Sequence, residues 1–504
     1  MIKRKFSKQY KAPCPGNISL LRIYHKLIKN KSIKRSARAE NLLRVRPVRS
    51  LSGIVNVSVL TKPYACPGRC LYCPTEKGIP KSYVSGEPAV ERAKSLRYDP
   101  YLQVKKRIGM LKEEGHLTDK IEIRIVGGTW SYYPKKYQEW FIKRCFDACN
   151  AKSNKPQSFN EKAKHRVVGL SIETRPDFIN QDEIKSLRNF GVTMVELGVQ
   201  SIYDDVLKIN RRGHGVGETI KATKLLKDAG FKILYQMMPN LPGSRPGRDL
   251  KMFKELFSDQ NFQPDLLKIY PCALLKESPL YKQWKQKKYK PYTDKQLINL
   301  MIGIKKAVPC YVRIQRIARD IPGYKIPNMR QIIAEKSKKQ GWKCQCIRCR
   351  EIKTDYKPKE KLSLLRRNYN ASDGKEIFLS FENKDKRIYS LLRLRISPQN
   401  VAIIRELHTY GQLCPIDSCQ KTINVSPQHK GLGKKLIKEA EKITKKEFSL
   451  NKISVIAAVG TRDYFRKQGY TLKKTYMEKS LVSKKPIIEN KAMGGRAGIG
   501  CRTF

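Results

Sequence analysis

Acidic residues are scarce in this sequence: 44 Asp and Glu stand against 105 Lys and Arg in 504 residues, a formal net charge of +61. A charge of this sign and size attracts polyanions, so nucleic acid is the first partner that we expect. A lysine bias shared by all proteins of the organism is the alternative explanation of any single basic patch. The sequence also lacks a bilayer-spanning apolar run and a signal-peptide pattern, which predicts a cytoplasmic protein with no membrane association.

The 14 cysteines indicate metal rather than disulfides, because a reducing compartment keeps thiols unpaired. Cys66, Cys70 and Cys73 have the spacing Cys-x-x-x-Cys-x-x-Cys in a turn-rich loop. Three thiolates can hold a [4Fe-4S] cluster with one iron open to an outside molecule, whereas structural zinc needs four ligands. The spacing resembles the signature of radical S-adenosylmethionine (SAM) enzymes, whose open iron chelates SAM. A zinc knuckle with a distant fourth ligand is the alternative.

A second group of thiols, Cys344, Cys346 and Cys349, is spaced too tightly for chance in a helix. Three thiolates suggest zinc with a fourth ligand from elsewhere in the chain. We expect this site to clamp two domains together.

The first 50 residues carry fifteen Lys and Arg residues and one acid, Glu40. Apolar residues recur at helical spacing between positions 18 and 28, which predicts a basic amphipathic helix. A surface that contacts nucleic-acid phosphates is one interpretation of this segment, and a merely solvated face is the other.

Strands and helices alternate for about two hundred residues after the run 53–60, which predicts parallel strands joined by crossover helices. The expected fold is an α/β radical SAM partial (β/α) barrel. Its predicted strands are 121–126, 167–172, 194–199, 232–237 and 267–270, with a helix over 217–229. In such barrels the chemistry lies at the carboxyl ends of the strands.

Unusual residues follow or end these strands. Gly127 and Gly128, followed by Thr129, would let the backbone approach a ligand. A comparable glycine pair meets the SAM amino group in radical SAM proteins. A plain turn is the alternative. Glu196 and Gln200 share one strand face and, when buried, need partners such as SAM or the substrate. An internal network that only fixes the barrel is the other interpretation.

Lys268 and Tyr270 also share a strand face and are expected to point into the reaction chamber. A buried lysine needs an anionic partner, for which Glu173 and Glu196 are candidates. Lys268 would orient a substrate, which the family resemblance described below implies to be the acetyl group or the tRNA backbone; a structural Lys–Glu pair is the alternative. His214, in a basic glycine-rich loop over 210–215, is a further catalytic candidate, although a solvated loop has the same composition.

The pattern changes after about residue 360. Strands are expected over 376–381, 388–396, 401–407, 422–425 and 453–459, with a helix to about 446. Glycines at the start of that helix would free backbone amides for phosphates. The loop, with the spacing Gln-x-x-Gly-x-Gly, and the stretch 464–470 resemble a GCN5-related N-acetyltransferase (GNAT) α+β domain. The candidate acetyl-CoA residues are Gln428, His429, Lys430, Gly431, Leu432, Gly433, Tyr464 and Phe465.

These features together resemble the Elongator catalytic subunit family of radical SAM tRNA acyltransferases, over nearly the whole chain. The supporting phrases are residues 46–53, 97–101, 172–177, 198–201, 237–243, 267–271 and 405–411. We expect five parts: a tRNA-binding segment 1–52, a radical SAM domain 53–324, a linker 325–359, a GNAT domain 360–485 and a tail 486–504.

The resemblance implies synthesis of 5-carboxymethyluridine at wobble position 34 of tRNA from acetyl-CoA and SAM. In that scheme a 5′-deoxyadenosyl radical removes hydrogen from the acetyl methyl, the carbon radical adds to uridine, and the thioester is hydrolysed. An external electron donor is implied. Eukaryotic members space the first two cluster cysteines more widely, which indicates a prokaryotic form that acts without other Elongator subunits. Phe465 stands where many relatives carry a second tyrosine.

Two other functions fit parts of the sequence. A protein lysine acetyltransferase would use the C-terminal domain alone, and a tRNA-binding scaffold would carry a degenerate cluster. The intact cysteine spacing argues against the scaffold, and the full barrel argues against a plain acetyltransferase. No oligomeric state is predicted.

Overall fold

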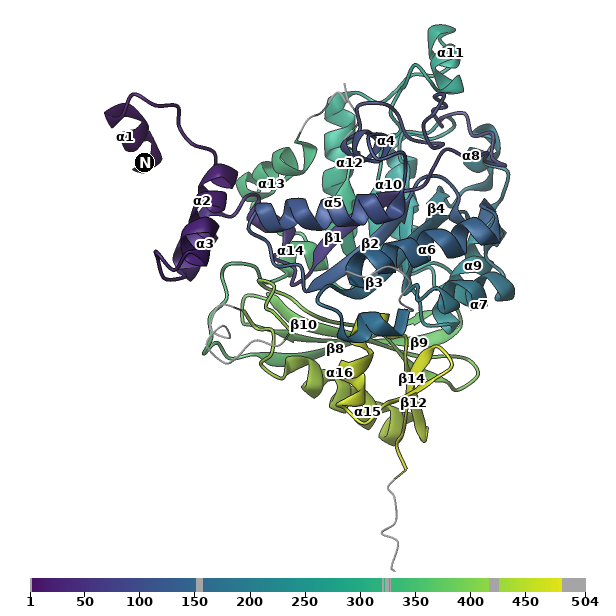
Figure 1. Cartoon of the computed structure of the whole chain (residues 1–504). Coiled ribbons are helices and arrows are strands. Elements are labelled where there is room, and N and C mark those ends of the chain that lie inside the picture. Colours follow the sequence, from purple (N-terminus) through teal and green to yellow (C-terminus); the bar gives the residue numbers. More distant parts are fainter. Residues whose placement is uncertain are drawn as a thin grey trace, which may run out of the picture.

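A seven-stranded parallel sheet forms the first half of the molecule in the computed structural model, which describes residues 2–150, 157–319, 321, 326, 328–416 and 426–482. Its strands lie side by side in sequence order, from β1 to β7. The two end strands are edges, so the curled sheet is a partial barrel (Figure 1). The strands are β1 (Val55–Leu60), β2 (Lys120–Val126), β3 (Arg166–Thr174), β4 (Met194–Gln200), β5 (Lys232–Met237), β6 (Leu266–Ile269) and β7 (Arg313–Ile317).

Helices cover the outer face of this sheet. All seven residues of β4 are buried, as expected for a strand covered on both faces. Local signals set the helix starts: Asp99 caps α5 by accepting from the Leu102 amide at 2.8 Å, and proline follows the cap. The helices are α4 (Pro88–Lys94), α5 (Pro100–Glu113), α6 (Lys135–Asn150), α7 (Gln181–Asn189), α8 (Asp204–Ile209), α9 (Val216–Asp228), α10 (Pro246–Ser258), α11 (Pro279–Lys285), α12 (Asp294–Ala307), α13 (Met329–Lys339) and α14 (Ile347–Arg350).

A second, mixed sheet follows, in the order β13-β14-β12-β11-β10-β9-β8, with one long helix. Adjacent strands of this sheet run antiparallel, except β11 and β12, which run parallel to each other. This agrees with an α+β domain. The elements are β8 (Ser363–Ala371), β9 (Gly374–Glu382), β10 (Ile388–Ile396), β11 (Ala402–Thr409), α15 (Leu432–Phe448), β12 (Lys452–Val455), α16 (Arg462–Arg466), β13 (Thr471–Lys473) and β14 (Tyr476–Ser480).

Buried ion pairs join the two sheets. Arg405 of β11 contacts Asp265, just before β6, at 3.1 Å and Glu376 of β9 at 2.8 Å. Arg395 of β10 contacts Asp228 at the end of α9 at 3.0 Å. Burial alone would raise the pKa of Asp265, but Arg405 and its other cationic neighbours hold it well below its ordinary value. Because removal of one partner would leave a buried charge unpaired, these pairs fix how the domains sit.

The N-terminal helices α1 (Ile2–Gln9), α2 (Asn17–Lys29) and α3 (Ala37–Leu43) stand to one side of the barrel (Figure 1). The amphipathic helix predicted over 18–28 is therefore present as α2. It buries Leu21 and Tyr24 and contacts α5, so the segment is anchored. Each helix in the described part of the chain is too short or too polar to cross a membrane.

Some elements differ from the prediction. The sequence did not predict four strands, β7, β8, β13 and β14. In β7 arginines interrupt the apolar residues, and β8 and β13 are edge strands whose side chains are mostly exposed, so none of these three has a clear apolar pattern. The strand predicted over 453–459 ends at Val455. The strand predicted over 422–425 and the tail 486–504 lie outside the described residues.

Candidate active site

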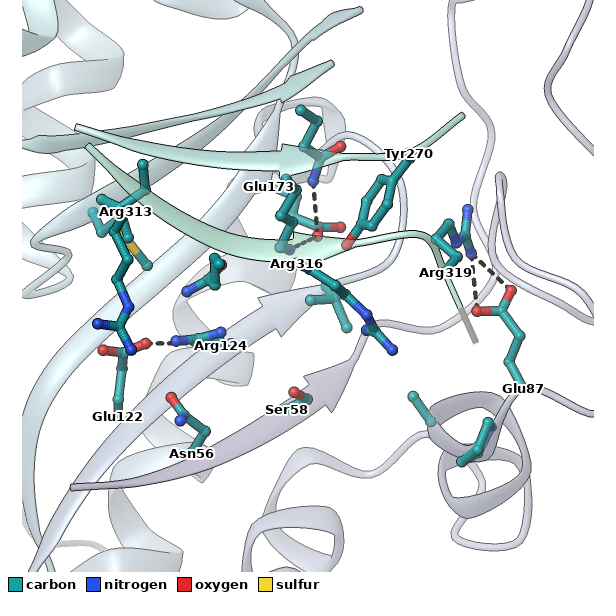
Figure 2. A pocket seen from close by; sticks show the side chains of 18 of the residues that line it. Asn56, Ser58, Glu87, Glu122, Arg124, Glu173, Tyr270, Arg313, Arg316 and Arg319 are labelled. Carbon is teal, nitrogen blue, oxygen red and sulfur yellow. Dashed lines mark hydrogen bonds and ion pairs between the residues drawn. The ribbon is translucent and has the colours of Figure 1, made fainter. Parts of the chain in front are cut away.

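A cavity of about 630 Å³ runs along the inside of the partial barrel; we call it the barrel cavity. Its lining includes residues near the strand starts, such as Asn56 and Arg313, and residues at or after the strand ends, such as Gln200 and Tyr270. Figure 2 shows this lining along the strands, with Glu122 towards their starts and Arg319 beyond their ends. The barrel cavity therefore extends from one end of the barrel to the other.

The barrel cavity is strongly cationic, since eleven Arg and Lys side chains and five Glu side chains line it. Each of the five acids already has a cationic partner. The pairs are Glu87 with Arg319 at 2.7 Å, Glu122 with Arg124 at 2.5 Å, Glu173 with Lys268 at 3.1 Å, Glu351 with Arg313 at 2.6 Å and Glu406 with Lys232 at 3.3 Å. The lining thus carries more cations than acids, and this excess of positive charge favours an anionic ligand.

Lys268 of β6 reaches across the barrel to two carboxylates. It contacts Glu173 of β3 at 3.1 Å and forms a second ion pair with Glu196 of β4. Burial alone would lower the pKa of Lys268, but Glu196 and the other neighbours raise it above its ordinary value. Burial raises the pKa of Glu196, whereas Lys268 outweighs burial at Glu173 and lowers its pKa. Tyr270 and Lys268 both line the cavity, and the sequence could not choose between a functional and a structural lysine.

The loop 66–74, here called the cluster loop, lies at the carboxyl end of the barrel. Cys73 lines the barrel cavity, Cys66 Sγ lies 3.8 Å from Thr129 Oγ1, and Arg212 approaches Cys70 Sγ at 3.5 Å. The pKa of Cys73 is raised to about 12, mainly because the thiol is buried and also because Cys70 lies next to it. A metal would relieve this cost because it binds the thiolate directly.

Buried polar atoms without partners surround the cluster loop. Among the described residues these include Gln200 Oε1, Arg175 Nη1, the Tyr72 hydroxyl and His214 Nε2. Such atoms are rare in folded proteins and indicate a polar ligand. Three thiols on one turn, together with these atoms, fit a [4Fe-4S] cluster with SAM bound to it.

Only some of the predicted SAM and catalytic residues line the barrel cavity. Gln200 lines it, whereas Gly127, Gly128 and Thr129 follow β2 beside the cluster loop. Both glycines have positive φ, +120° and +81°, and a side chain at Gly127 would collide with Thr61. His214 is not among the cavity residues; burial and Arg212 lower its pKa to about 4.

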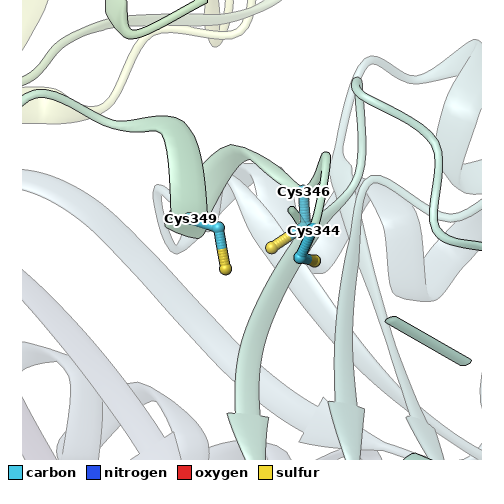
Figure 3. Close-up of side chains that lie close together, drawn as sticks. All are labelled: Cys344, Cys346 and Cys349. Carbon is cyan, nitrogen blue, oxygen red and sulfur yellow. The ribbon is translucent and has the colours of Figure 1, made fainter. Parts of the chain in front are cut away.

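Cys344, Cys346 and Cys349 form a compact group in which the sulfur atoms lie within 4.8 Å of one another (Figure 3). A zinc ion with Zn–S bonds of about 2.3 Å requires thiolates this close, whereas a larger iron–sulfur cluster needs more room. No fourth His, Cys, Asp or Glu of the described chain joins the group. Next to it, Arg350 contacts Glu382 of β9 at 2.6 Å and the Ile347 amide donates to Val312, so the group lies between the domains.

A second cavity, of about 490 Å³, opens where β11 and β12 part; we call it the second cavity. The strands pair only as far as Ile404 and Val455, and the residues beyond, 405–409 and 456–458, line the space between them. The start of α15 also lines it, with Gly431 at φ +78° as the residue before the helix. Free amides at a helix start form an anion site.

The predicted acetyl-CoA residues surround this second cavity, with one exception. Gln428, His429, Gly431, Leu432, Gly433, Tyr464 and Phe465 line it, and Lys430 does not. The Gln428 amide donates to Gly53 O at 3.1 Å and accepts from Lys120 Nζ at 2.9 Å, so its side chain joins the two domains. Phe465 is buried in the domain core next to Tyr470.

The two cavities adjoin each other. The residues that line both are Ile54, Glu122, Lys232, Glu406 and His408. Ile54, Glu122 and Lys232 lie at the beginnings of strands, so the second cavity meets the barrel cavity at the amino end of the barrel. None of the five was a predicted site residue. Glu406 and His408 belong to the phrase 405–411, which could have indicated them, but Glu122 and Lys232 carried no local signal.

Comparison with known proteins agrees with this architecture. Residues 61–252 match the model of the radical SAM superfamily, and residues 264–346 match that of the Radical_SAM C-terminal domain. The chain is 44% identical over 471 residues to the tRNA uridine(34) acetyltransferase of Methanocaldococcus infernus, covering 87% of this chain and 88% of the relative. It is 37% identical over 477 residues to Elongator complex protein 3 of Homo sapiens, covering 87% and 86%.

A solved structure, the archaeal Methanocaldococcus infernus Elp3 with N-terminus deletion (1-46), superposes with a TM-score of 0.75 at 41% identity. The match covers 86% of this chain and all of that one. Fold, cluster loop and matches thus define a radical SAM enzyme that carries an additional mixed-sheet domain, and this class implies SAM and a [4Fe-4S] cluster. The chain belongs to the family of the tRNA uridine(34) acetyltransferases and Elongator complex protein 3.

Proposed function

We propose that this protein converts uridine 34 of tRNA to 5-carboxymethyluridine, with acetyl-CoA as the carbon source and SAM as the source of the radical. The observation that carries the proposal is that five residues line both cavities. A radical site and an acyl-donor site can then act on one substrate without release of an intermediate. The names of the relatives, which specify uridine 34 of tRNA, support the choice of substrate.

Cys66, Cys70 and Cys73 would hold a [4Fe-4S] cluster that, with SAM, supplies a 5′-deoxyadenosyl radical after reduction by an external electron donor. Gln200 lines the barrel cavity and its Oε1 has no partner in the described part of the chain, so this atom would accept a hydrogen bond from SAM. Gly127, Gly128 and Thr129 would bring the backbone against the same ligand. Arg212 donates to Cys70 Sγ at 3.5 Å and so places a cation beside the cluster loop.

In the second cavity, the amides at the start of α15 would bind the pyrophosphate of acetyl-CoA, as in a GNAT domain. Gly433 supports this, since a side chain there would come within 2.8 Å of the Tyr464 hydroxyl and narrow the cavity. The thioester end would then point towards the residues that both cavities share. The lining residue Lys120 has its pKa lowered to about 8 by burial, so it can exchange a proton near neutral pH.

Lys268 and Tyr270 would orient the acetyl group and the uridine inside the barrel cavity. Lys268 is held in place by two carboxylates, and Glu196 retains a proton more readily than an ordinary Glu because it is buried. Glu196 is therefore a candidate to hold or deliver a proton at the reacting groups. Cys344, Cys346 and Cys349 would bind zinc as a structural clamp between the domains.

The test is anaerobic reconstitution with iron, sulfide, tRNA, SAM, acetyl-CoA and a chemical reductant, followed by mass spectrometry of the nucleosides. The proposal expects 5-carboxymethyluridine at position 34, with no need for other Elongator subunits. Cys66→Ala should abolish the product, and Cys145→Ala, which removes a buried thiol on α6 away from the cluster loop, should retain it. Unmodified uridine 34 together with acetylated protein lysines would instead favour a lysine acetyltransferase.

A further inference from the structure

Arg46, Arg92 and Arg107 line the barrel cavity near β1. Arg46 precedes the short 3₁₀ turn Pro47–Arg49, Arg92 lies on α4 and Arg107 lies on α5. Both helices pack against β1, which is an edge of the partial barrel. The three guanidinium groups therefore border the side of the barrel where the sheet is open.

These three side chains make no hydrogen bond or ion pair with the described part of the chain, in contrast to the cations of the five glutamate pairs. The adjacent Arg49 is paired with Glu114. The pKa of Arg107 is lowered to about 10, mainly because the side chain is buried and also because the charges of Arg49 and Arg92 lie nearby. Burial and Arg49 likewise lower the pKa of Arg92. Partly desolvated cations that repel one another are costly unless an anion joins them.

The barrel cavity itself does not supply that anion, because each of its five glutamates is already paired with another cation. The ligand must come from outside. The planar fork of arginine matches the geometry of a phosphate better than any other cationic side chain does. Three forks on three separate elements can surround one or two phosphate groups.

We propose that Arg46, Arg92 and Arg107 form a phosphate-binding site that holds the RNA backbone next to the nucleotide entering the barrel cavity. This inference rests on the proposed function for the identity of the RNA. Coenzyme A also carries phosphates, but the cavity assigned to it contains none of the three arginines. The RNA backbone is therefore the source to which we commit.

The test compares two double variants with equal loss of charge on the same two helices. Arg92→Gln with Arg107→Gln removes two of the proposed phosphate ligands. The matched control is Lys94→Gln with Lys106→Gln, whose side chains are exposed and do not line the cavity. The probe is a 5′-labelled RNA hairpin with the sequence of an anticodon arm that carries uridine 34. Binding is measured against salt concentration, without iron, SAM or acetyl-CoA.

The arginine variant should bind the hairpin roughly a hundredfold more weakly at moderate salt, about tenfold for each charged hydrogen-bonding group removed. Its log–log salt slope should fall by roughly 1.4 to 1.8, and the lysine control should change affinity less than about threefold. Arg46→Gln, on an exposed turn outside both helices, provides a second variant that does not disturb helix packing.

Equal effects in the arginine variant and the lysine control would overturn the inference in favour of a general electrostatic field. Weaker binding of acetyl-CoA with unchanged RNA affinity would overturn it in favour of coenzyme A. Because RNA binding is measured without the reaction, an absence of modified uridine in the reconstitution would count against the proposed function and leave this result untouched.

Discussion

Replacing Lys268 by Met would leave two carboxylates without their shared cation, because Lys268 contacts both Glu173 and Glu196. Loss of one partner of a buried ion pair typically costs about 3 to 5 kcal/mol. For a domain of this size that corresponds to a fall in the melting temperature on the order of 10 °C. The same substitution at Lys185, whose partner Asp182 is also exposed, should cost only about 0 to 1 kcal/mol and serves as the control.

The stability lost in the Lys268→Met variant should depend on pH and be greater at higher pH. Wild-type Glu173 has a lowered pKa and stabilises the fold above the pKa of the unfolded chain. Without Lys268 the pKa of this carboxyl would rise, so the folded state would have to bind a proton or hold an unpaired charge. The deficit in melting temperature should therefore be largest near pH 8 and shrink towards pH 5. Thermal melts of wild type and variant across this range measure it.

A second substitution separates stability from function. Glu196→Gln in the Lys268→Met background removes one unpaired carboxylate and should recover most of the stability. Because Glu196 is itself a candidate proton donor, Glu196→Gln alone, which keeps Lys268, is the reference for product formation. If Lys268 orients the substrates, the recovered protein will cleave SAM but make little carboxymethyluridine. Normal product formation by the stable double variant would refute the functional role, and a pH-independent deficit would refute the electrostatic reasoning.

Three further predictions concern metal and RNA. Cys70→Ala should remove the iron–sulfur absorption of the anaerobically reconstituted protein and its SAM cleavage, with tRNA affinity unchanged; wild-type protein without that absorption would contradict the cluster. Neutralising the exposed Lys29, Lys31 and Lys34 should lower the log–log salt slope of tRNA binding by roughly 0.7 to 0.9 for each phosphate that the protein no longer neutralises, and an unchanged slope would make them a solvated face. Removal of zinc by a chelator, or Cys346→Ser, should lower the melting temperature and leave the iron–sulfur band intact; metal analysis without zinc would contradict the clamp.

The neutralisation experiment omits Arg35, which the sequence places next to these lysines. In the structure Arg35 contacts Glu40 at 2.8 Å, so its charge is already partly balanced. The same comparison applies to Gln428, a predicted acetyl-CoA residue that lines the second cavity and whose side-chain amide joins the two domains. Burial and partners thus changed the expected role of residues whose local structure follows from the sequence.

Short sequence windows determined much of this protein. The spacing of Cys66, Cys70 and Cys73, the alternation of strands and helices and the glycines before α15 are local patterns, since thiol spacing, strand period and helix start depend on neighbouring residues. The parallel barrel, the thiol groups and the separate C-terminal domain could be predicted for that reason.

Only the tertiary structure decided which distant residues meet. The two cavities share Glu122, Lys232 and Glu406, which lie on three strands far apart in the sequence. The fold likewise paired every glutamate of the barrel cavity and left Arg92 and Arg107 without a partner in the described part of the chain. Pairing of charges depends on distance and burial in the folded chain, and neither quantity is encoded in the spacing of residues along it.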